Sequence, residues 1–211
     1  MKILRYYLVL ASCILLSGCG PLNSQFMKLS EGLKSYEVSR GNIKELNGVK
    51  NLLIVGPFIG ADDEHHMCLT GENGSFPSDS DIIFITKHND AQRFAAGFKK
   101  AGLFNTELYL ELYYDRIEET IKRLKTMGSV EIKKELKLKQ APEMILFGAI
   151  KKFGHDVAPL RAIIVNVQYE LEFYNPDSRQ SVLIDVAVLE PFGEDLNTII
   201  SETKDRMATG K

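Results

Sequence analysis

The spacing of apolar positions changes from segment to segment along the chain, and these changes mark the expected strands and helices. Leu52–Val55 is a continuous apolar run closed by Gly56 and Pro57, which is typical of a buried strand. Thr106–Tyr113 alternates leucine with polar or aromatic residues, which predicts a half-buried strand. Composition predicts two more strands, Asp81–Thr86 and Met144–Ile150.

Three segments repeat apolar residues at intervals of three and four, which predicts helices. In the first, Asn89 or Asp90 caps the start, Gly102 ends it, and the apolar stripe is Ala91, Phe94, Ala95, Phe98 and Ala101. The second runs from about Asp115 to Met127, with Ile117, Ile121 and Leu124 on one face. The third is a short helix within Val130–Lys139, ended by Pro142.

Two alternating runs, Ile163–Phe173 and Ser181–Leu189, follow near the carboxyl terminus. Asn175-Pro176-Asp177-Ser178 lies between them and predicts a tight turn, so the pair is expected to be an antiparallel hairpin. Its Glu170 and Glu172 indicate one wet face, and Asp185 is expected at an outward position. The predicted fold class is α/β (α+β): an open mixed β-sheet with two or three helices packed on it and this hairpin.

Polar and small residues divide the chain into parts. Residues 19–47 are rich in glycine, serine and proline, which predicts a flexible tether that follows a processed amino terminus. A single α/β domain is expected over residues 48–200, with a long loop from Gly60 to Ser80. A short helix begins at Glu194, and residues 201–211 are expected to form a frayed tail.

The first 18 residues have the pattern of a signal peptide. Lys2 and Arg5 precede the apolar run Leu8–Leu16, which at about nine residues is too short to span a hydrocarbon core of roughly 30 Å. The end of this run overlaps Leu15 to Cys19 (Leu-Leu-Ser-Gly-Cys), which resembles a bacterial lipobox. The resemblance implies that Cys19 is the site of lipid attachment and that residues 1–18 are removed.

Gly20 follows the acylated cysteine. In enterobacterial lipoproteins an aspartate at this position commonly means retention in the inner membrane, so the resemblance favours the outer membrane, facing the periplasm. The chain has 26 basic and 28 acidic residues, and loss of Lys2 and Arg5 leaves a net charge of −4. This mildly acidic balance argues against nucleic acid as a partner.

Cysteine and histidine supply little chemistry. With Cys13 removed and Cys19 acylated, Cys68 has no partner for an internal disulfide. It is either buried and inert or open to an intermolecular bond, and we expect it to be buried. The segment Asp62–Cys68 contains His65 and His66 and collects ligand types that suit a transition metal. However, adjacent histidines on an extended chain point to opposite sides, so we expect a solvated loop with no metal and no cofactor. His88 and His155 are interpreted as surface groups.

No catalytic motif is present in the sequence. It has no Gly-x-Ser-x-Gly and no phosphate-binding glycine loop, and Gly56–Gly60 lacks the third glycine of a dinucleotide loop. Tyr109, Tyr113 and Tyr114 either stack a ligand or cover a sheet edge.

Two segments resemble a known family. Phe94–Phe104 looks like the helix and exit of the amino-terminal domain of TolB and of the curli-secretion lipoprotein group, and Lys134–Ile150 is similar to their helix and apolar strand. The likeness covers roughly residues 49–189 and implies an envelope lipoprotein.

The predicted function is therefore non-catalytic. We expect a binding and assembly lipoprotein that is held at the membrane by Cys19 and docks another envelope protein. The alternative is a ligand or metal carrier, or a small hydrolase, that uses the Gly60–Ser80 loop.

Overall fold

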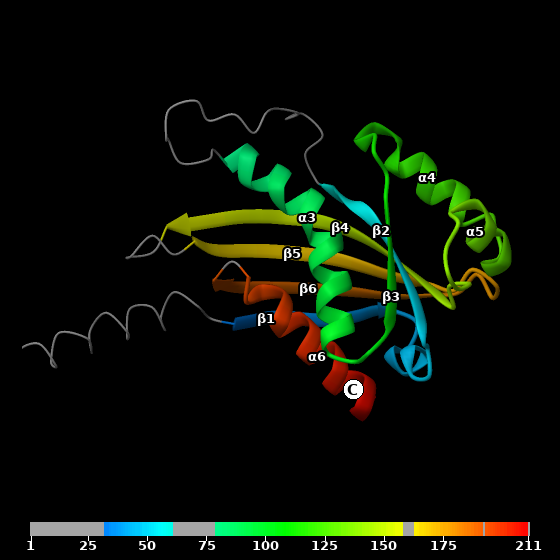
Figure 1. The fold of residues 1–211 in the computed structure, drawn as a ribbon. Helices are drawn as coiled ribbons and strands as arrows, with labels where there is room; N and C mark the ends of the chain where they lie inside the picture. Colours follow the sequence, from blue (N-terminus) through cyan, green and yellow to red (C-terminus); the bar gives the residue numbers. More distant parts are fainter. Residues whose placement is uncertain (1–31, 61–78, 158–162, 192, 211) are drawn as a thin grey trace, which may run out of the picture.

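An open mixed sheet organises the part of the chain that the structure describes (Figure 1). The computed structural model describes residues 32–60, 79–157, 163–191 and 193–210. In these ranges the six strands lie in the order β1-β6-β5-β4-β2-β3. They are β1 (Gly32–Arg40), β2 (Asn51–Gly60), β3 (Asn105–Leu110), β4 (Met144–Val157), β5 (Ile163–Tyr174) and β6 (Ser181–Pro191).

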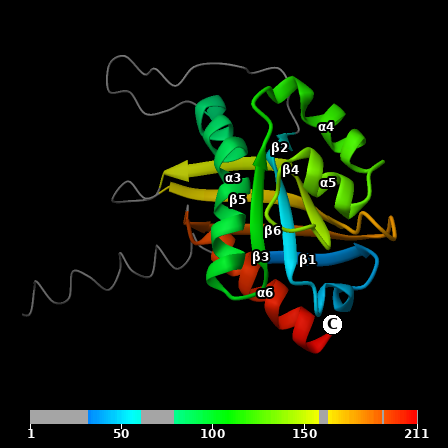
Figure 2. The ribbon, with the colours of Figure 1, turned by 45° about the vertical axis from the view of Figure 1, so that its right-hand side comes forward.

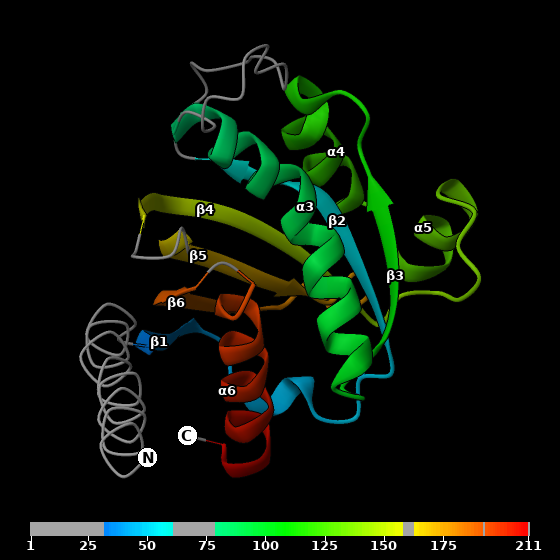
Figure 3. The same ribbon diagram turned by 60° about the vertical axis from the view of Figure 1, so that its left-hand side comes forward.

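The sheet has an antiparallel half and a parallel half. Strands β1, β6, β5 and β4 are antiparallel, whereas β2 runs parallel to both β4 and β3. The helices are η1 (Ile43–Leu46), α3 (Asp79–Lys100), η2 (Tyr114–Arg116), α4 (Ile117–Leu124), α5 (Ser129–Glu135) and α6 (Asp195–Thr209). Figures 2 and 3 show α3 and α6 on one face, and α4 and α5 on the other, beside β2 and β4.

The larger core lies between the sheet and the pair α3 and α6. The Phe94 ring of α3 packs 5.5 Å from Phe58 of β2 and 5.6 Å, edge to face, from Tyr169 of β5. Buried aromatic side chains remove much apolar surface from water, so these contacts fix α3 on the sheet. The inward positions of the hairpin complete this core: Val165, Val167, Leu171, Phe173, Val182, Ile184, Val186 and Val188.

A smaller core lies on the opposite face. Ile117 and Leu124 of α4 and Ile132 of α5 pack over β2, β4 and the end of β5. The sheet residues that they cover are Leu53, Val55, Ile145, Phe147 and Tyr174. Strands β2 and β4 are thus buried on both faces, which is why they read as continuous apolar runs rather than as alternating ones.

The predicted fold class is confirmed. The sheet is open and mixed, helices pack on it, and β5 and β6 form the expected antiparallel hairpin, in which Tyr174 faces Ser181. The predicted polar face of the hairpin is also present. Glu170 and Glu172 are half-buried on the face away from α3 and α6. Glu170 pairs with Lys151 at 3.0 Å, and Glu172 pairs with Lys125 at 2.6 Å. Asp185 lies on this same outward face.

The predicted tether is wrong for residues 32–47. Residues 32–40 form β1, which pairs antiparallel with β6, and η1 follows. Tyr36, Ile43 and Leu46 are buried in the larger core. A single edge strand with few apolar residues has a weak local signal, and here the long-range pairing with β6 decides its conformation. The folded domain therefore begins before residue 48.

The strand predicted at Asp81–Thr86 is also wrong. These residues belong to α3, which begins at Asp79 and continues without a break to Lys100. Isoleucine, phenylalanine and threonine favour strands, but propensity is a weak influence that tertiary context overrides. The predicted Gly60–Ser80 loop lies mostly outside the described residues: Gly60 ends β2, and Asp79 and Ser80 begin α3.

The frayed tail predicted for residues 201–211 is a helix as far as Thr209. Thr203 and Met207 continue the stripe set by Leu196, Ile199 and Ile200, and both are buried. The Thr203 hydroxyl and the Tyr36 hydroxyl lie 2.9 Å apart, which ties α6 to β1. The helix ends at Gly210, whose φ of 71° is the left-handed conformation of a helix C-cap.

Candidate functional site

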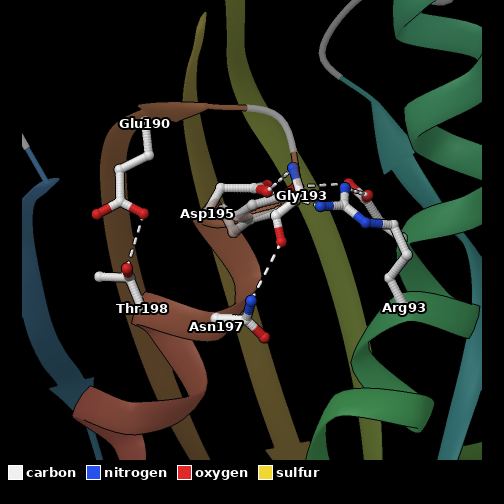
Figure 4. A network of polar contacts seen from close by, with 8 residues as sticks. Arg93, Glu190, Gly193, Asp195, Asn197 and Thr198 are labelled. Carbon is white, nitrogen blue, oxygen red and sulfur yellow. Dashed lines mark hydrogen bonds and ion pairs between the residues drawn. The ribbon is translucent and has the colours of Figure 1, made fainter. Parts of the chain in front are cut away.

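A buried charge network joins α3, α6 and β5, and Figure 4 shows its part around Arg93 and Asp195. Arg93 donates to Asp90 at 2.9 Å and to Asp195 at 2.6 Å, so one guanidinium bridges two carboxylates. The Tyr169 hydroxyl donates to the other oxygen of Asp90 at 2.5 Å. Asp195 also accepts the backbone N–H of Gly193 at 3.0 Å.

Burial controls the protonation of this network. It raises the pKa of Asp90 to about 7, against the opposing effects of the Tyr169 hydrogen bond and the Arg93 charge. It also raises the pKa of Tyr169 well above its usual range, and the negative charge of Asp90 adds to this. A shifted carboxylate of this kind is a candidate for chemistry only where a substrate can reach it.

Access to the network is poor. Asp90 is fully buried, and every buried side-chain polar atom in the described part of the chain has a hydrogen-bond partner. A surface groove of about 250 Å³ between α3 and α6 is lined by Arg93 and Gly193 of the network, but not by Asp90, Asp195 or Tyr169, and Arg93 is already bonded to both carboxylates. We therefore interpret the network as a structural link between α3, α6 and the sheet.

The outer edge of β3 is a different kind of site. Among the described residues, β3 ends the sheet and pairs only with β2, over six consecutive residue pairs without a register shift. The N–H groups of Asn105 and Glu111 point to β2, donating to Lys50 at 2.7 Å and Gly56 at 2.7 Å. Alternate residues of a strand direct their backbone groups to opposite sides, so those of Thr106, Leu108 and Leu110 point outward.

Exposed apolar side chains continue this edge. The exposed fractions are 36% for Leu108, 86% for Leu112 and 58% for Tyr113, which are three of the four large apolar residues exposed in the described ranges. We call the outward backbone groups of Thr106, Leu108 and Leu110, together with these side chains, the β3 edge. An open edge strand with exposed apolar residues is a template for pairing with another chain.

Glu111 holds the apolar end of the β3 edge in place. Its carboxylate accepts hydrogen bonds from the Thr120 hydroxyl at 2.9 Å and the Tyr109 hydroxyl at 3.2 Å, and a longer one from the Tyr113 N–H at 3.4 Å. Burial alone would raise the pKa of Glu111, but these bonds outweigh it and lower the pKa. Leu112 and Tyr113 are thus presented by an anchored turn.

The opposite edge of the sheet is protected. Strand β1 has register shifts between Leu33 and Ser35 and between Val38 and Arg40. It also exposes Lys34, Glu37 and Arg40. Bulges and charged side chains are the usual means by which edge strands avoid pairing with other chains. The contrast between the two edges singles out β3.

The three predicted tyrosines favour the sheet-edge interpretation over ligand stacking. Tyr109 packs in the smaller core, and the Arg116 guanidinium lies 5.0 Å from the exposed Tyr113 ring. The Tyr114 hydroxyl instead accepts the N–H of Gly60 at 3.0 Å, at the end of β2. The structure thus gives the three residues separate surroundings. The sequence pattern pointed to Tyr113 as a candidate, whereas it did not indicate that β3 lies at an edge of the sheet.

The other predicted site residues form no cluster within the described part of the chain. Cys19, His65, His66 and Cys68 lie outside the described residues, so lipid attachment and the loop chemistry stay predictions. His88 falls within α3, and His155 falls within β4 opposite Val165, and their expected surface position stays a prediction. The described ranges contain no group of three or more histidine, cysteine or acidic residues that could hold a metal ion.

No described helix is both long enough and apolar enough to cross a bilayer.

Comparison with known proteins gives only distant likeness. No protein-family model and no curated protein matches the chain. Two solved dodecamers of PelC from Paraburkholderia phytofirmans are 12% and 10% identical, with TM-scores of 0.40 and 0.39, and each comparison covers 83% of this chain and 96% of PelC. XCC0632 from Xanthomonas campestris, a DUF330 protein, is 8% identical with a TM-score of 0.29, covering 83% and 86%.

At these identities and TM-scores the likeness assigns no function to this chain. None of these three structures is a TolB or curli-secretion protein, so that resemblance stays a prediction.

Proposed function

We propose that this chain is a lipid-anchored lipoprotein of the bacterial envelope whose domain docks another protein through the β3 edge, without catalysis. Cys19 attaches the chain to a membrane, with the outer membrane, facing the periplasm, as the expected location. The observation that carries the docking role is the edge itself: outward backbone groups on β3 continue into exposed Leu112 and Tyr113.

The physical basis is β-strand addition. An extended segment that lies along β3 gains main-chain hydrogen bonds from the outward backbone groups, and its alternate side chains reach the apolar residues that flank them. The parallel pairing of β2 with β3 keeps these groups in register, since it has no bulge. The buried network of Asp90 and Arg93 supports the same non-catalytic interpretation, because it leaves no reactive group open to a substrate.

Site-specific photo-crosslinking in intact cells tests the proposal. A photoreactive amino acid is placed at Leu112, and as a control at Val130, which is 73% exposed on α5 and follows Ser129, a residue that bonds Asp177 in the turn between β5 and β6. We expect one dominant adduct, in the membrane fraction, from position 112 and not from position 130. Equal adducts at both positions, or none at position 112, would contradict docking through β3.

The alternative role of the Gly60–Ser80 loop has its own measurement. Metal content of the purified chain is determined by mass spectrometry, with and without replacement of His65 and His66. Stoichiometric metal that disappears in the double variant would favour the carrier or hydrolase.

A further inference from the structure

Lysines surround the amino-terminal end of β3 from both faces of the sheet. Lys99 lies in the last turn of α3, and its carbonyl accepts the N–H of Gly102, three residues before β3 begins, at 3.1 Å. On the other face, the N–H of Lys139 donates to the Glu107 carboxylate of β3 at 3.0 Å. Figure 3 shows β3 at the margin of the sheet between α3 and α5. The exposed lysines at this end are Lys50, Lys99, Lys100, Lys137 and Lys139.

None of these five lysines forms an ion pair within the described residues. The two carboxylates at this end are occupied by backbone groups. Glu107 accepts the N–H groups of Lys139 and Gln140, each at 3.0 Å, and Glu143 accepts the N–H of Lys50 at 2.6 Å. The amino-terminal end of β3 therefore presents positive charge, whereas its carboxyl-terminal end presents Leu108, Leu112 and Tyr113.

We propose that the occupant of the β3 edge is an extended segment of another envelope protein with acidic residues at one end and apolar residues at the other. This inference rests on the proposed function and adds the chemistry of the partner. The acidic end lies beside Asn105, where the lysines gather, and the apolar end lies beside Leu112. Opposite charge along an interface steers the encounter and fixes its register.

Two other occupants fit less well. A second copy of this chain would offer either another β3, whose amino-terminal end is basic, or β1, which exposes Lys34 and Arg40 beside Glu37. Neither edge supplies an excess of acidic side chains. Anionic lipid headgroups complement the lysines but have no extended backbone to pair with the outward groups of Thr106, Leu108 and Leu110.

Peptide selection on the full lipidated chain in detergent micelles tests this chemistry. A library of ten-residue peptides of random sequence is selected for binding to the chain. We expect the selected peptides to carry acidic residues at one end and apolar residues at the other, and to bind less tightly when Leu112 is replaced by serine. Selection of basic or neutral peptides, or of none, would overturn the proposal.

Charge reversal supplies the matched comparison. Lys137→Glu with Lys139→Glu should weaken binding of the selected peptides roughly tenfold, because exposed charges contribute only modestly each. Lys152→Glu with Arg40→Glu makes the same charge change on exposed residues of β4 and β1, and should alter affinity by less than about twofold. Equal losses in the two double variants would refute the role of the lysines at β3. Thermal melts confirm that each variant folds.

The outcomes separate this inference from the proposed function. If position 112 still crosslinks one partner but no acidic preference exists, docking stands and the partner chemistry is wrong. An adduct of twice the chain mass would identify a second copy and overturn both. Binding to vesicles of phosphatidylglycerol that is lost on reversing Lys137 and Lys139 but kept in Leu112→Ser would assign the lysines to lipid, and would also overturn the inference.

Discussion

At the scale of single residues, burial decides what each polar group does. Asp90 was expected as a helix cap, but it lies inside α3. There it binds Arg93 of the same helix and Tyr169 of β5, which is 79 positions further along the chain. No local pattern in the sequence signals such a contact, because its members are distant in sequence. Glu111, by contrast, binds groups within nine residues, so its role depends mainly on the local turn.

The raised pKa of Asp90 predicts a pH-dependent stability. Its pKa is about 7 in the folded chain and about 4 when unfolded, so the folded state binds the proton more tightly. The stabilising contribution is complete below about pH 4 and is lost as the pH rises to about 7, at roughly 1 kcal/mol per pH unit. Urea unfolding of the wild type should show this loss relative to Asp90→Asn.

Asp177→Asn is the control for this measurement. Hydrogen bonds from Ser129 lower the pKa of Asp177, so its contribution is present at neutral pH and is lost only as the pH falls through its lowered pKa. Between pH 5 and 7, the free energy of unfolding of Asp177→Asn should therefore change with pH at the same slope as that of the wild type. If wild type and Asp90→Asn give parallel curves over this range, Asp90 does not titrate as the structure indicates.

At the scale of elements, alternation and helical spacing predicted most of the sheet. Strands with their own strong pattern were found, namely β2 to β6, as were the helical segments that carry Phe94 and Ile117. Strand β1 was missed because its conformation depends on β6, and the start of α3 was misread because β-branched residues there favour strands. The order of strands also lies beyond local pattern, so the edge position of β3 could not be predicted.

The buried face of β1 can be tested directly. Tyr36→Ala removes a ring from the larger core, which should lower the free energy of unfolding by about 3 kcal/mol. Tyr36→Phe keeps the ring and loses only the hydrogen bond with Thr203, which should cost about 1 kcal/mol. Chemical denaturation of both variants measures the difference. A flexible tether at residues 32–47 would leave both variants as stable as the wild type.

At the scale of the whole molecule, anchor and docking edge belong to different parts of the chain. The predicted attachment residue, Cys19, precedes β1 by about a dozen residues, and the β3 edge lies at the opposite side of the sheet from β1. A single acyl chain holds a protein only marginally, so stable attachment at Cys19 requires more than one acyl chain.

Replacement of the attachment residue tests the anchor. Cys19→Ser should leave the chain either unprocessed, with its first 18 residues retained, or released into the soluble fraction. Phase partitioning in detergent, combined with mass measurement of the mature chain, distinguishes these states from the lipidated form. Complete partitioning of the variant into the detergent phase would rule out Cys19 as the lipid site.

The pairing of the first strand with the last has a consequence for biogenesis. Tyr36 of β1 faces Val186 of β6 and hydrogen-bonds to Thr203 of α6, more than 160 residues later. Strand β1 can therefore reach its folded position only after β6 and α6 have been made. Contacts between segments so far apart form slowly, because a long loop must close first. A chain that is made from its amino terminus therefore keeps β1 unpaired until β6 and α6 are available, and completes its sheet last.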